Sequence, residues 1–388
     1  GLFLRGTQRG PSMTAAISAA ASLRETRVVC LLRGQVQGVG FRPFVYRQAV
    51  ALELAGHVLN DPTGVTLEAQ GPEAHLAELI RRIREDAPAL ARVDEVTLLA
   101  SLPLAPDTSF AIVASRHARA DRGRVTVDAA TCDDCLREMR DRGDRRHGHA
   151  LINCTNCGPR YTIVTGIPYD RPLTTMADFP LCTACQSEYD NPASRRFHAQ
   201  PNACPECGPQ LQLLDAKGQS LNVQDPLDET IRRLGNGQIV AVKGLGGYHL
   251  AVDATNPDAV QELRRRKQRD EKPFALMARS LEVAERLALI GADEARLLLG
   301  VERPIVLLQK RADHNLAENI APDNRYFGVI LPYMPLHYLL LQDEFEVLVM
   351  TSANLSDEPI AFEDHEACRR LKAIADAFLV HNRRIHTR

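Results

Sequence analysis

The chain has no tryptophan, almost no net charge and no uncharged run of 18 residues. A membrane-spanning helix needs about 18 or more predominantly apolar residues, and no window of that length is free of charge. Forty-seven basic and 49 acidic residues leave a net charge of −2, which gives no general attraction for nucleic acid or anionic lipid. With 388 residues, 45% hydrophobic and 25% charged, we expect two or three globular domains that bind neither membranes nor nucleic acid.

The N-terminal residues contain one weak candidate for an export signal. The run 15–23 is apolar, but it is short and rich in alanine, and no basic residue stands between Met13 and its start. We therefore expect residues 1–25 to form a disordered tail and the protein to be cytoplasmic.

Eight of the ten cysteines fall into four C-x-x-C pairs, separated by 18, 24 and 18 residues. Both 132–159 and 182–209 read C-x2-C-x18-C-x2-C-G-P, so the region contains a duplicated unit. Two such pairs complete a four-cysteine zinc site, and we expect two zinc ions. The predicted ligands are Cys132, Cys135, Cys154, Cys157, Cys182, Cys185, Cys204 and Cys207.

The repeat favours one zinc ion within each copy, although interleaved pairing of the copies is an alternative. Disulfides or a redox dithiol are further alternatives. The chain between the pairs is polar and rich in Gly, Pro and Asn. Because such a segment cannot build a hydrophobic core without metal, we expect the zinc to be structural.

Before the cysteines, an apolar strand from Val28 runs into a glycine-rich turn and then a helix. Such a turn directs backbone N–H groups toward one anion, and Arg42 at its exit can pair with phosphate oxygens. The turn is neither a Walker A loop nor a dinucleotide fingerprint. The predicted phosphate-binding loop is Gln37, Gly38, Val39, Gly40 and Phe41.

The following residues predict strands at 56–60 and 65–70, a helix at 72–85 and a strand at 93–100. The resulting order, β-α-β-β-α-β, is typical of a ferredoxin-like sandwich.

The motif G-x-V-Q-G-V-G-F-R at 34–42, with Asn60 eighteen residues after its arginine, resembles acylphosphatase over about 27–115. The resemblance implies that the loop and Arg42 bind the phosphoryl group of an acyl phosphate and that Asn60 orients the attacking water. The alternative is a glycine turn with a surface arginine and a turn-capping asparagine.

After the cysteines, strands and helices alternate again. Lys243 precedes a glycine turn, and a basic helix is predicted to stop at Lys272-Pro273, before a strand at 274–277. This junction could hold a triphosphate, although a solvated helix face is the alternative. A later strand, 347–350, ends at Thr351-Ser352-Ala353-Asn354, which could bind phosphate or ribose or form an ordinary turn. The predicted ATP- or carbamate-binding residues are Lys243, Lys267, Arg269, Lys272, Thr351, Ser352 and Asn354.

The motifs K-x-R-x-x-K-P, P-I-V-L-L and T-S-A-N-L-S resemble the YrdC-type α/β domain, over about 225–381. The order of the three parts is similar to that of the HypF family, the carbamoyltransferases of NiFe-hydrogenase maturation. We therefore expect an α+β multidomain protein. Its parts are a ferredoxin-like acylphosphatase domain (26–116), a duplicated four-cysteine zinc-finger domain (117–215) and a YrdC-like ATP-binding domain (222–388).

The resemblance implies a reaction sequence. Carbamoyl phosphate loses phosphate in the first domain, and the carbamate reacts with Mg²⁺-bound ATP in the third to give carbamoyl adenylate and pyrophosphate. The carbamoyl group then passes to the C-terminal cysteine of the partner HypE, on the way to the cyanide ligands. Family members carry a further C-terminal transfer domain that we do not find here, so we interpret the chain as an N-terminal fragment.

Two other functions could use the zinc region. The pairs Arg145-Arg146 and Arg195-Arg196 could contact nucleic acid, but the net charge and the absence of tryptophan and of aromatic residues among basic ones argue against this. A chaperone-like zinc module would leave Arg42 and the K-x-R-x-x-K-P motif unexplained.

Overall fold

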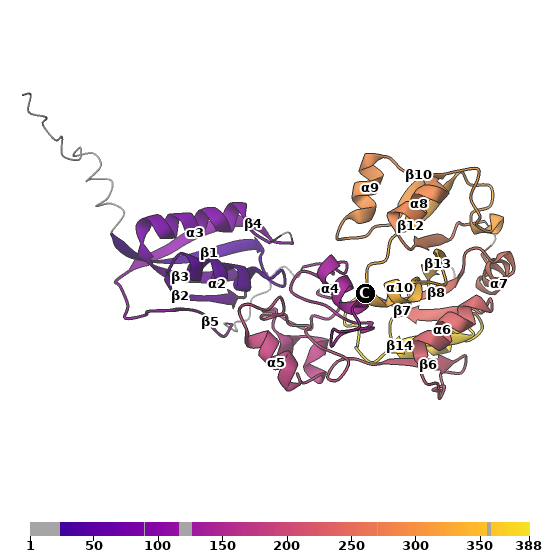
Figure 1. Cartoon of the computed structure of the whole chain (residues 1–388), viewed down its shortest axis with the longest axis horizontal. Helices are drawn as coiled ribbons and strands as arrows, with labels where there is room; N and C mark the ends of the chain where they lie inside the picture. The colour runs from indigo at the N-terminus through magenta and orange to yellow at the C-terminus, as the bar shows by residue number, and fades with distance from the viewer. Residues whose placement is uncertain (1–23, 89, 116–125, 270, 355–357) are drawn as a thin grey trace, which may run out of the picture. The chain divides into compact units, whose positions relative to one another are not determined.

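The computed structural model describes residues 24–88, 90–115, 126–269, 271–354 and 358–388, in two compact units (Figure 1). Unit 1 comprises the described residues through Thr126 together with Ile167–Asp170. Unit 2 comprises Val127–Gly166 and Arg171–Arg388. The tail expected at 1–25 lies almost entirely outside the described residues.

Unit 1 is a five-stranded sheet with two helices packed on it, and the predicted order β-α-β-β-α-β is confirmed. The strand order is β4-β1-β3-β2-β5, and the short β5 was not predicted. Leu76, Leu79 and Ile83 recur at helical spacing and are all buried, which fixes the inward face of the second helix. The elements are β1 Glu25–Gln35, α2 Phe41–Ala51, β2 Ala55–Asp61, β3 Gly64–Pro72, α3 Glu73–Glu85, β4 Arg92–Leu102 and β5 Phe110–Ile112.

The zinc region of unit 2 consists mainly of turns and short helices. The helices α4 Asp133–Arg140 and α5 Thr183–Asp190 each begin directly after the first cysteine of a repeat copy. Two short 3₁₀ helices, η1 Arg171–Leu173 and η2 Thr175–Asp178, lie between the copies. Apolar residues of the first copy pack into a core shared with the large sheet, whereas Met176 and Ala203 belong to a much smaller cluster.

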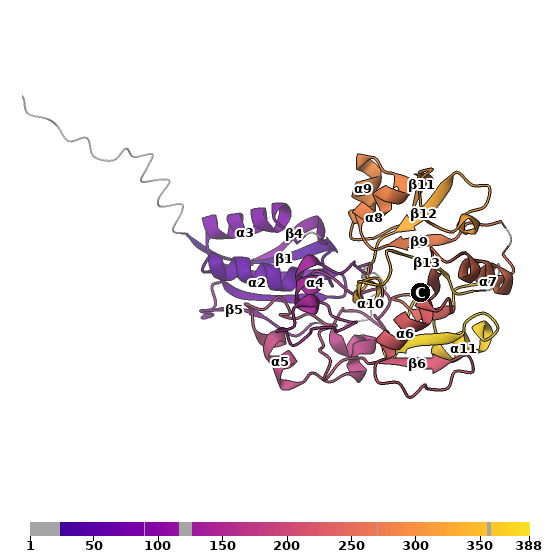
Figure 2. The same cartoon turned by 45° about the vertical axis from the view of Figure 1, so that its right-hand side comes forward.

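The rest of unit 2 is a nine-stranded mixed sheet with the order β10-β11-β12-β9-β13-β8-β7-β14-β6. Figure 2 shows β11, β12, β9 and β13 one below another in this order. The first strand of the sheet, β6, was not predicted; it lies within the residues expected to form the zinc-finger domain and pairs with β14 in this sheet. The strands are β6 Leu211–Asp215, β7 Val240–Lys243, β8 Tyr248–Asp253, β9 Ala275–Ala278, β10 Ala288–Leu289, β11 Val306–Lys310, β12 Tyr326–Ile330, β13 Val347–Ser352 and β14 Ala377–His381. The helices are α6 Pro226–Gly235, α7 Pro257–Lys267, α8 Leu281–Leu287, α9 Ala292–Leu299, η3 Glu318–Ile320, α10 Pro335–Leu340 and α11 Asp364–Leu371.

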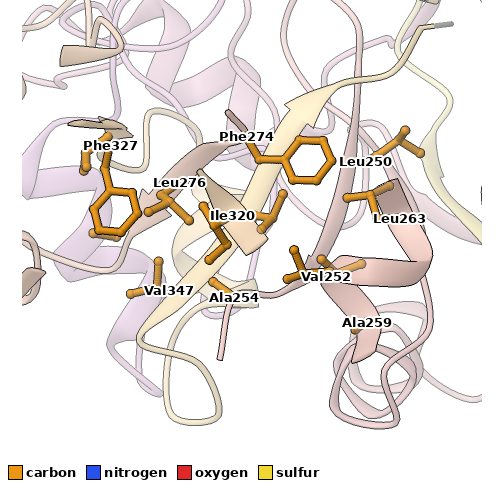
Figure 3. Packing of buried hydrophobic residues seen from close by; sticks show 14 of the residues in the cluster. Leu250, Val252, Ala254, Ala259, Leu263, Phe274, Leu276, Ile320, Phe327 and Val347 are labelled. Atoms are coloured by element: carbon orange, nitrogen blue, oxygen red, sulfur yellow. The ribbon is translucent and has the colours of Figure 1, made fainter. Parts of the chain in front are cut away.

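The large core of unit 2 lies between this sheet and its helices. Figure 3 shows Ala259 and Leu263 of α7 beside Leu250 and Val252 of β8, with Phe274 and its neighbours continuing the layer. Burial of this many apolar side chains is the main stabilising contribution to the unit. Among the described residues, we find no helix with both the length and the apolar character that crossing a bilayer requires.

The basic helix ends earlier than predicted. α7 stops at Lys267, because Gln268 takes the left-handed conformation (φ 50°), and the described residues between it and Pro273 belong to no helix or strand. The buried Arg264 guanidinium organises this loop: Nη1 donates to the carbonyls of Arg269 (2.8 Å) and Lys272 (3.3 Å). Since those carbonyls bond to a side chain, they do not continue the helix.

Candidate functional site

The glycine-rich turn of unit 1 has the backbone geometry of a phosphate loop. Gly38 and Gly40 have φ of 74° and 71°, values that other residues adopt only with strain. Gly40 is the N-cap of α2 and offers no side chain to its first N–H groups. We call residues 34–42 together with Asn60 the phosphate cradle.

Arg42 enters the cradle from the first turn of α2 and is 8% exposed. Its Nη2 donates to Oδ1 of Asp170 at 2.9 Å, and Nη1 donates to Ser115 Oγ at 3.3 Å. Two of the five guanidinium donors are therefore in use, and the remaining three can serve an anion.

Asn60, near the end of β2, is 1% exposed. Its Nδ2 donates to the Tyr169 carbonyl at 3.3 Å, and Oδ1 has no hydrogen-bond partner among the described residues. A buried acceptor without a partner is costly unless water or a ligand donates to it. The amide is therefore anchored by its nitrogen and free to accept a hydrogen bond at its oxygen.

The side chain of Gln37 forms hydrogen bonds with backbone groups around the cradle. Its Nε2 donates to the carbonyls of Asp61 (2.7 Å) and Gly64 (2.8 Å), and its Oε1 accepts from the Tyr169 N–H (3.1 Å). Gln37 thus ties the cradle to the β2–β3 turn and to the segment 167–170. Sequence reasoning missed that segment, because its contacts with Arg42 and Asn60 span 128 and 109 residues and no local motif indicates them.

The eight paired cysteines form two clusters, Cys132, Cys135, Cys154 and Cys157, and Cys182, Cys185, Cys204 and Cys207. Each contains the cysteines of one repeat copy, as the duplication favours. Neighbouring Sγ atoms lie 3.6 to 3.9 Å apart. A tetrahedral zinc ion with Zn–S bonds of about 2.3 Å requires separations of about 3.8 Å. The two clusters therefore fit two zinc ions.

Each copy of the repeat supports the sulfurs of the other. Arg145 of the first copy donates to Cys182 Sγ (3.5 Å) and Cys185 Sγ (3.3 Å). Arg195 of the second copy lies 3.8 to 3.9 Å from the sulfurs of Cys132 and Cys135. The next arginines, Arg146 and Arg196, pair reciprocally with Glu188 and Glu138. Guanidinium groups beside thiolates offset the negative charge of a four-cysteine site.

The second candidate site lies where several neighbouring strands of the large sheet end. The carboxyl ends of β7, β13 and β14 meet the start of β8, with Lys243 opposite Tyr248 and Ser352 opposite His249. Side chains at these strand ends come from four strands, the last residue of α7 adds Lys267, and the chain after α7 adds Arg269.

Five predicted residues are brought together here: Lys267, Arg269, Thr351, Ser352 and Asn354, which we call the strand-end cluster. Lys267 is 3% exposed, and its Nζ donates to the Ser352 carbonyl (2.8 Å), to Asn354 Oδ1 (2.9 Å) and to the Asn354 carbonyl. Arg269 Nη1 donates to Thr351 Oγ1 at 3.1 Å. Burial, helped by the charges of Arg269 and Lys272, lowers the pKa of Lys267 to about 8.

Two other predicted residues are placed differently. Lys243 is buried at the end of β7, two strands from Ser352, and pairs with Asp364 (2.5 Å) and the His381 carbonyl (2.9 Å). The side chain of Lys272 is exposed, and only its carbonyl takes part in the loop.

Asp364 and Arg264 were not predicted from the sequence. Asp364 accepts from Tyr248 Oη at 2.6 Å as well as pairing with Lys243. Arg264 holds the loop that carries Arg269. The only sequence signal for Arg264 is its place in the basic run, and the sequence does not indicate which arginine of that run is buried.

Three family models match the chain. The acylphosphatase model matches residues 28–112, the HypF finger model matches 131–164 and 181–214, and a Sua5, YciO and YrdC model described as telomere recombination matches 232–388. An acylphosphatase of Moorella thermoacetica is 46% identical over 86 residues, which cover 22% of this chain and 90% of that protein.

Longer relatives match nearly the whole chain. The carbamoyltransferase HypF of Rhodobacter capsulatus is 51% identical over 92% of this chain and 47% of its own length. A crystal structure of full-length HypF in a phosphate- and nucleotide-bound form matches with a TM-score of 0.89 and 43% identity, covering 94% of this chain and 48% of that one. T. kodakarensis HypF matches with a TM-score of 0.86 and 40% identity, covering 94% and 47%. The chain spans about half the length of the curated relatives that it matches. These matches, together with the two cysteine clusters and the three-part order, show that the chain belongs to the HypF family.

Proposed function

We propose that unit 1 releases phosphate from carbamoyl phosphate and that unit 2 uses ATP to convert the resulting carbamate into carbamoyl adenylate and pyrophosphate. The observation that carries the proposal is the cradle, where Arg42 and the acceptor oxygen of Asn60 lie on a loop with left-handed glycines.

In unit 1, the loop N–H groups and Arg42 would hold the phosphoryl oxygens and stabilise the charge that develops as the P–O bond breaks. The Asn60 oxygen would accept a hydrogen bond from the attacking water and so orient the water toward phosphorus. Positioning and charge suffice for such a transfer, since an acyl phosphate has a good leaving group.

In unit 2, the strand-end cluster would bind Mg²⁺-bound ATP. All three donors of Lys267 already bond to residues 352 and 354. We therefore assign Lys267 the task of holding the β13 end in shape and supplying a positive charge, while Arg269 and the Thr351 and Ser352 hydroxyls would contact phosphate or ribose. Lys243 lies at the end of β7, two strands from Ser352, and would help to bind carbamate or ATP from that position.

The remaining steps concern the whole protein. We propose that the carbamoyl group passes to the C-terminal cysteine of HypE, on the way to the cyanide ligands of NiFe hydrogenase. The relatives named carbamoyltransferase support this step. A cytoplasmic location would suit a protein whose ten cysteines, all among the described residues, form no disulfide.

We assign the two zinc ions a structural role, and the two copies of the repeat offer a matched test. Three cysteines of the first cluster belong to the core shared with the large sheet, and none of the second cluster does. Cys154→Ser should therefore lower the thermal stability of unit 2 more than Cys204→Ser, while each variant binds one zinc ion instead of two. Equal losses of stability would contradict the predicted difference between the copies, and no loss in either variant would contradict the structural role.

The proposed reactions are tested by measuring phosphate and pyrophosphate release with carbamoyl phosphate and ATP, together and singly. Arg42→Ala should lower phosphate release from carbamoyl phosphate by about 10²- to 10³-fold, the usual effect of losing a group that stabilises developing charge. Arg84→Ala, on the exposed face of α3, is the control and should keep the wild-type rate. Pyrophosphate should require both substrates. Folded, zinc-loaded protein that releases neither product would refute the proposal.

A further inference from the structure

The segment Ile167–Asp170 adds a carboxylate to the phosphate cradle. It lies outside residues 28–112, which match the acylphosphatase model, yet it belongs to unit 1. Its Tyr169 carbonyl accepts from Asn60, and Asp170 Oδ1 accepts from Arg42 at 2.9 Å. Both residues that the proposed function places at the reaction are therefore in contact with this segment.

A carboxylate at this position has an electrostatic cost. It neutralises the guanidinium that would bind the phosphoryl group, and its charge repels any phosphate that shares Arg42. Phosphate ligands in general should bind less well than they would without it. The Asp170 carboxylate is explained if it makes a favourable contact with some substrates and not with others.

Asp170 has unused capacity to accept hydrogen bonds. A carboxylate can accept about four, and the described residues supply Asp170 with one, from Arg42. Its side chain is partly exposed, so the remaining acceptor sites are accessible beside the cradle.

Acyl phosphates differ in what they can donate. In carbamoyl phosphate an amino group with two N–H donors is attached to the carbonyl carbon, close to the phosphoryl group. Acetyl phosphate carries a methyl group of similar size there, and inorganic phosphate has no acyl group. Pocket shape discriminates poorly between groups of equal size, whereas an acceptor that hydrogen-bonds to one of the two groups discriminates better.

We propose that Asp170 determines specificity: its carboxylate accepts a hydrogen bond from the amino group of the acyl phosphate held by Arg42, so the cradle selects carbamoyl over other acyl groups. The inference rests on the proposed hydrolysis in unit 1. It adds a residue outside the acylphosphatase match to that site.

The test uses the full 388-residue chain and compares kcat/KM for carbamoyl phosphate and acetyl phosphate. In Asp170→Asn, Arg42 keeps an oxygen acceptor, but the amide nitrogen cannot accept from the substrate. The preference for carbamoyl phosphate should fall tenfold or more, and inorganic phosphate should inhibit more strongly because the repelling charge is gone. The control is Asp178→Asn, the same change at an exposed residue of η2, which should leave both values unchanged.

The alternative is that Asp170 only holds Arg42 in place. Both rates would then fall together in Asp170→Asn, and phosphate inhibition would weaken, which would overturn the inference. A wild-type chain that hydrolyses acetyl phosphate as well as carbamoyl phosphate would overturn it without any variant. If the wild type hydrolyses neither, the proposed function fails and this inference fails with it.

Discussion

The two sites proposed to bind phosphate, the cradle of unit 1 and the strand-end cluster of unit 2, are built from different parts of the chain. The cradle is mostly backbone: left-handed glycines shape it, and Arg42 adds one guanidinium. The strand-end cluster consists of side chains from two distant stretches, and its cations bond to the neighbouring strand end. The cradle is therefore built from a local motif, whereas the strand-end cluster depends on the sheet that brings its parts together.

The largest effect should come from removing the buried cation of the strand-end cluster. Lys267→Met removes the ammonium group that donates to the carbonyl oxygens of residues 352 and 354, and among the described residues the Ser352 carbonyl keeps only the Asn354 N–H as a donor. A distorted strand end should lower pyrophosphate formation by about 10²-fold or more. Phosphate release from carbamoyl phosphate should stay within about twofold of wild type, because the cradle is in the other unit.

The control for this variant is Arg265→Met, which removes an exposed cation of the same helix. It should leave both products unchanged. Equal losses of phosphate and pyrophosphate release in Lys267→Met would contradict the prediction that the two sites are independent.

A smaller effect is expected from pH, which should change the affinity of unit 2 for ATP and leave phosphate release by unit 1 unaffected. The pKa of Lys267 is lowered to about 8, so the residue is mostly charged at pH 7 and mostly neutral at pH 9. Affinity for ATP should fall as the pH rises through 8, by at most about tenfold per pH unit. Phosphate release at the cradle should not change for this reason, because an arginine does not deprotonate in this range.

The measurement is an ATP titration between pH 7 and 9, on wild type and on Lys267→Met. The variant should show weaker binding without the step near pH 8. An ATP affinity that rises with pH, or a step that survives in the variant, would contradict the role given to Lys267.

The smallest effect should come from the loop backbone. At Gly40, with φ of 71°, an added Cβ is strained by about 1–2 kcal/mol. Gly40→Ala should destabilise unit 1 by about this much and slow phosphate release several-fold, with no change in ATP binding. Gly235→Ala is the matched control: it ends α6, an added Cβ would meet nothing within 4 Å, and denaturant unfolding should show no loss of stability. Equal behaviour of the two variants would mean that the left-handed turn is not needed.

The comparison also explains which features could be predicted from the sequence. The cradle loop, the ferredoxin-like order and the grouping of cysteines within each copy follow from short spacings. Residues close in sequence, or in register within a repeat, are constrained to meet.

The missed features depend on contacts between distant residues. The end of α7 depends on Arg264, whose guanidinium also bonds to the Ile320 carbonyl 56 residues away, and propensity alone favours a longer helix through the basic run. Asp170 lies 128 residues from Arg42, and nothing in its local sequence indicates phosphate chemistry. Lys243 is near the cluster only through the strand order of the sheet.

The most direct test of the central claim, two sites acting in series on carbamate, is a bypass experiment. Ammonium and bicarbonate equilibrate with carbamate in water, so they supply the proposed intermediate without the cradle. With ATP and carbamoyl phosphate, Arg42→Ala should form almost no pyrophosphate, and added ammonium bicarbonate should restore it, whereas Lys267→Met should not be rescued. Normal pyrophosphate formation by Arg42→Ala without added carbamate, or no rescue although the variant still binds ATP, would contradict the account.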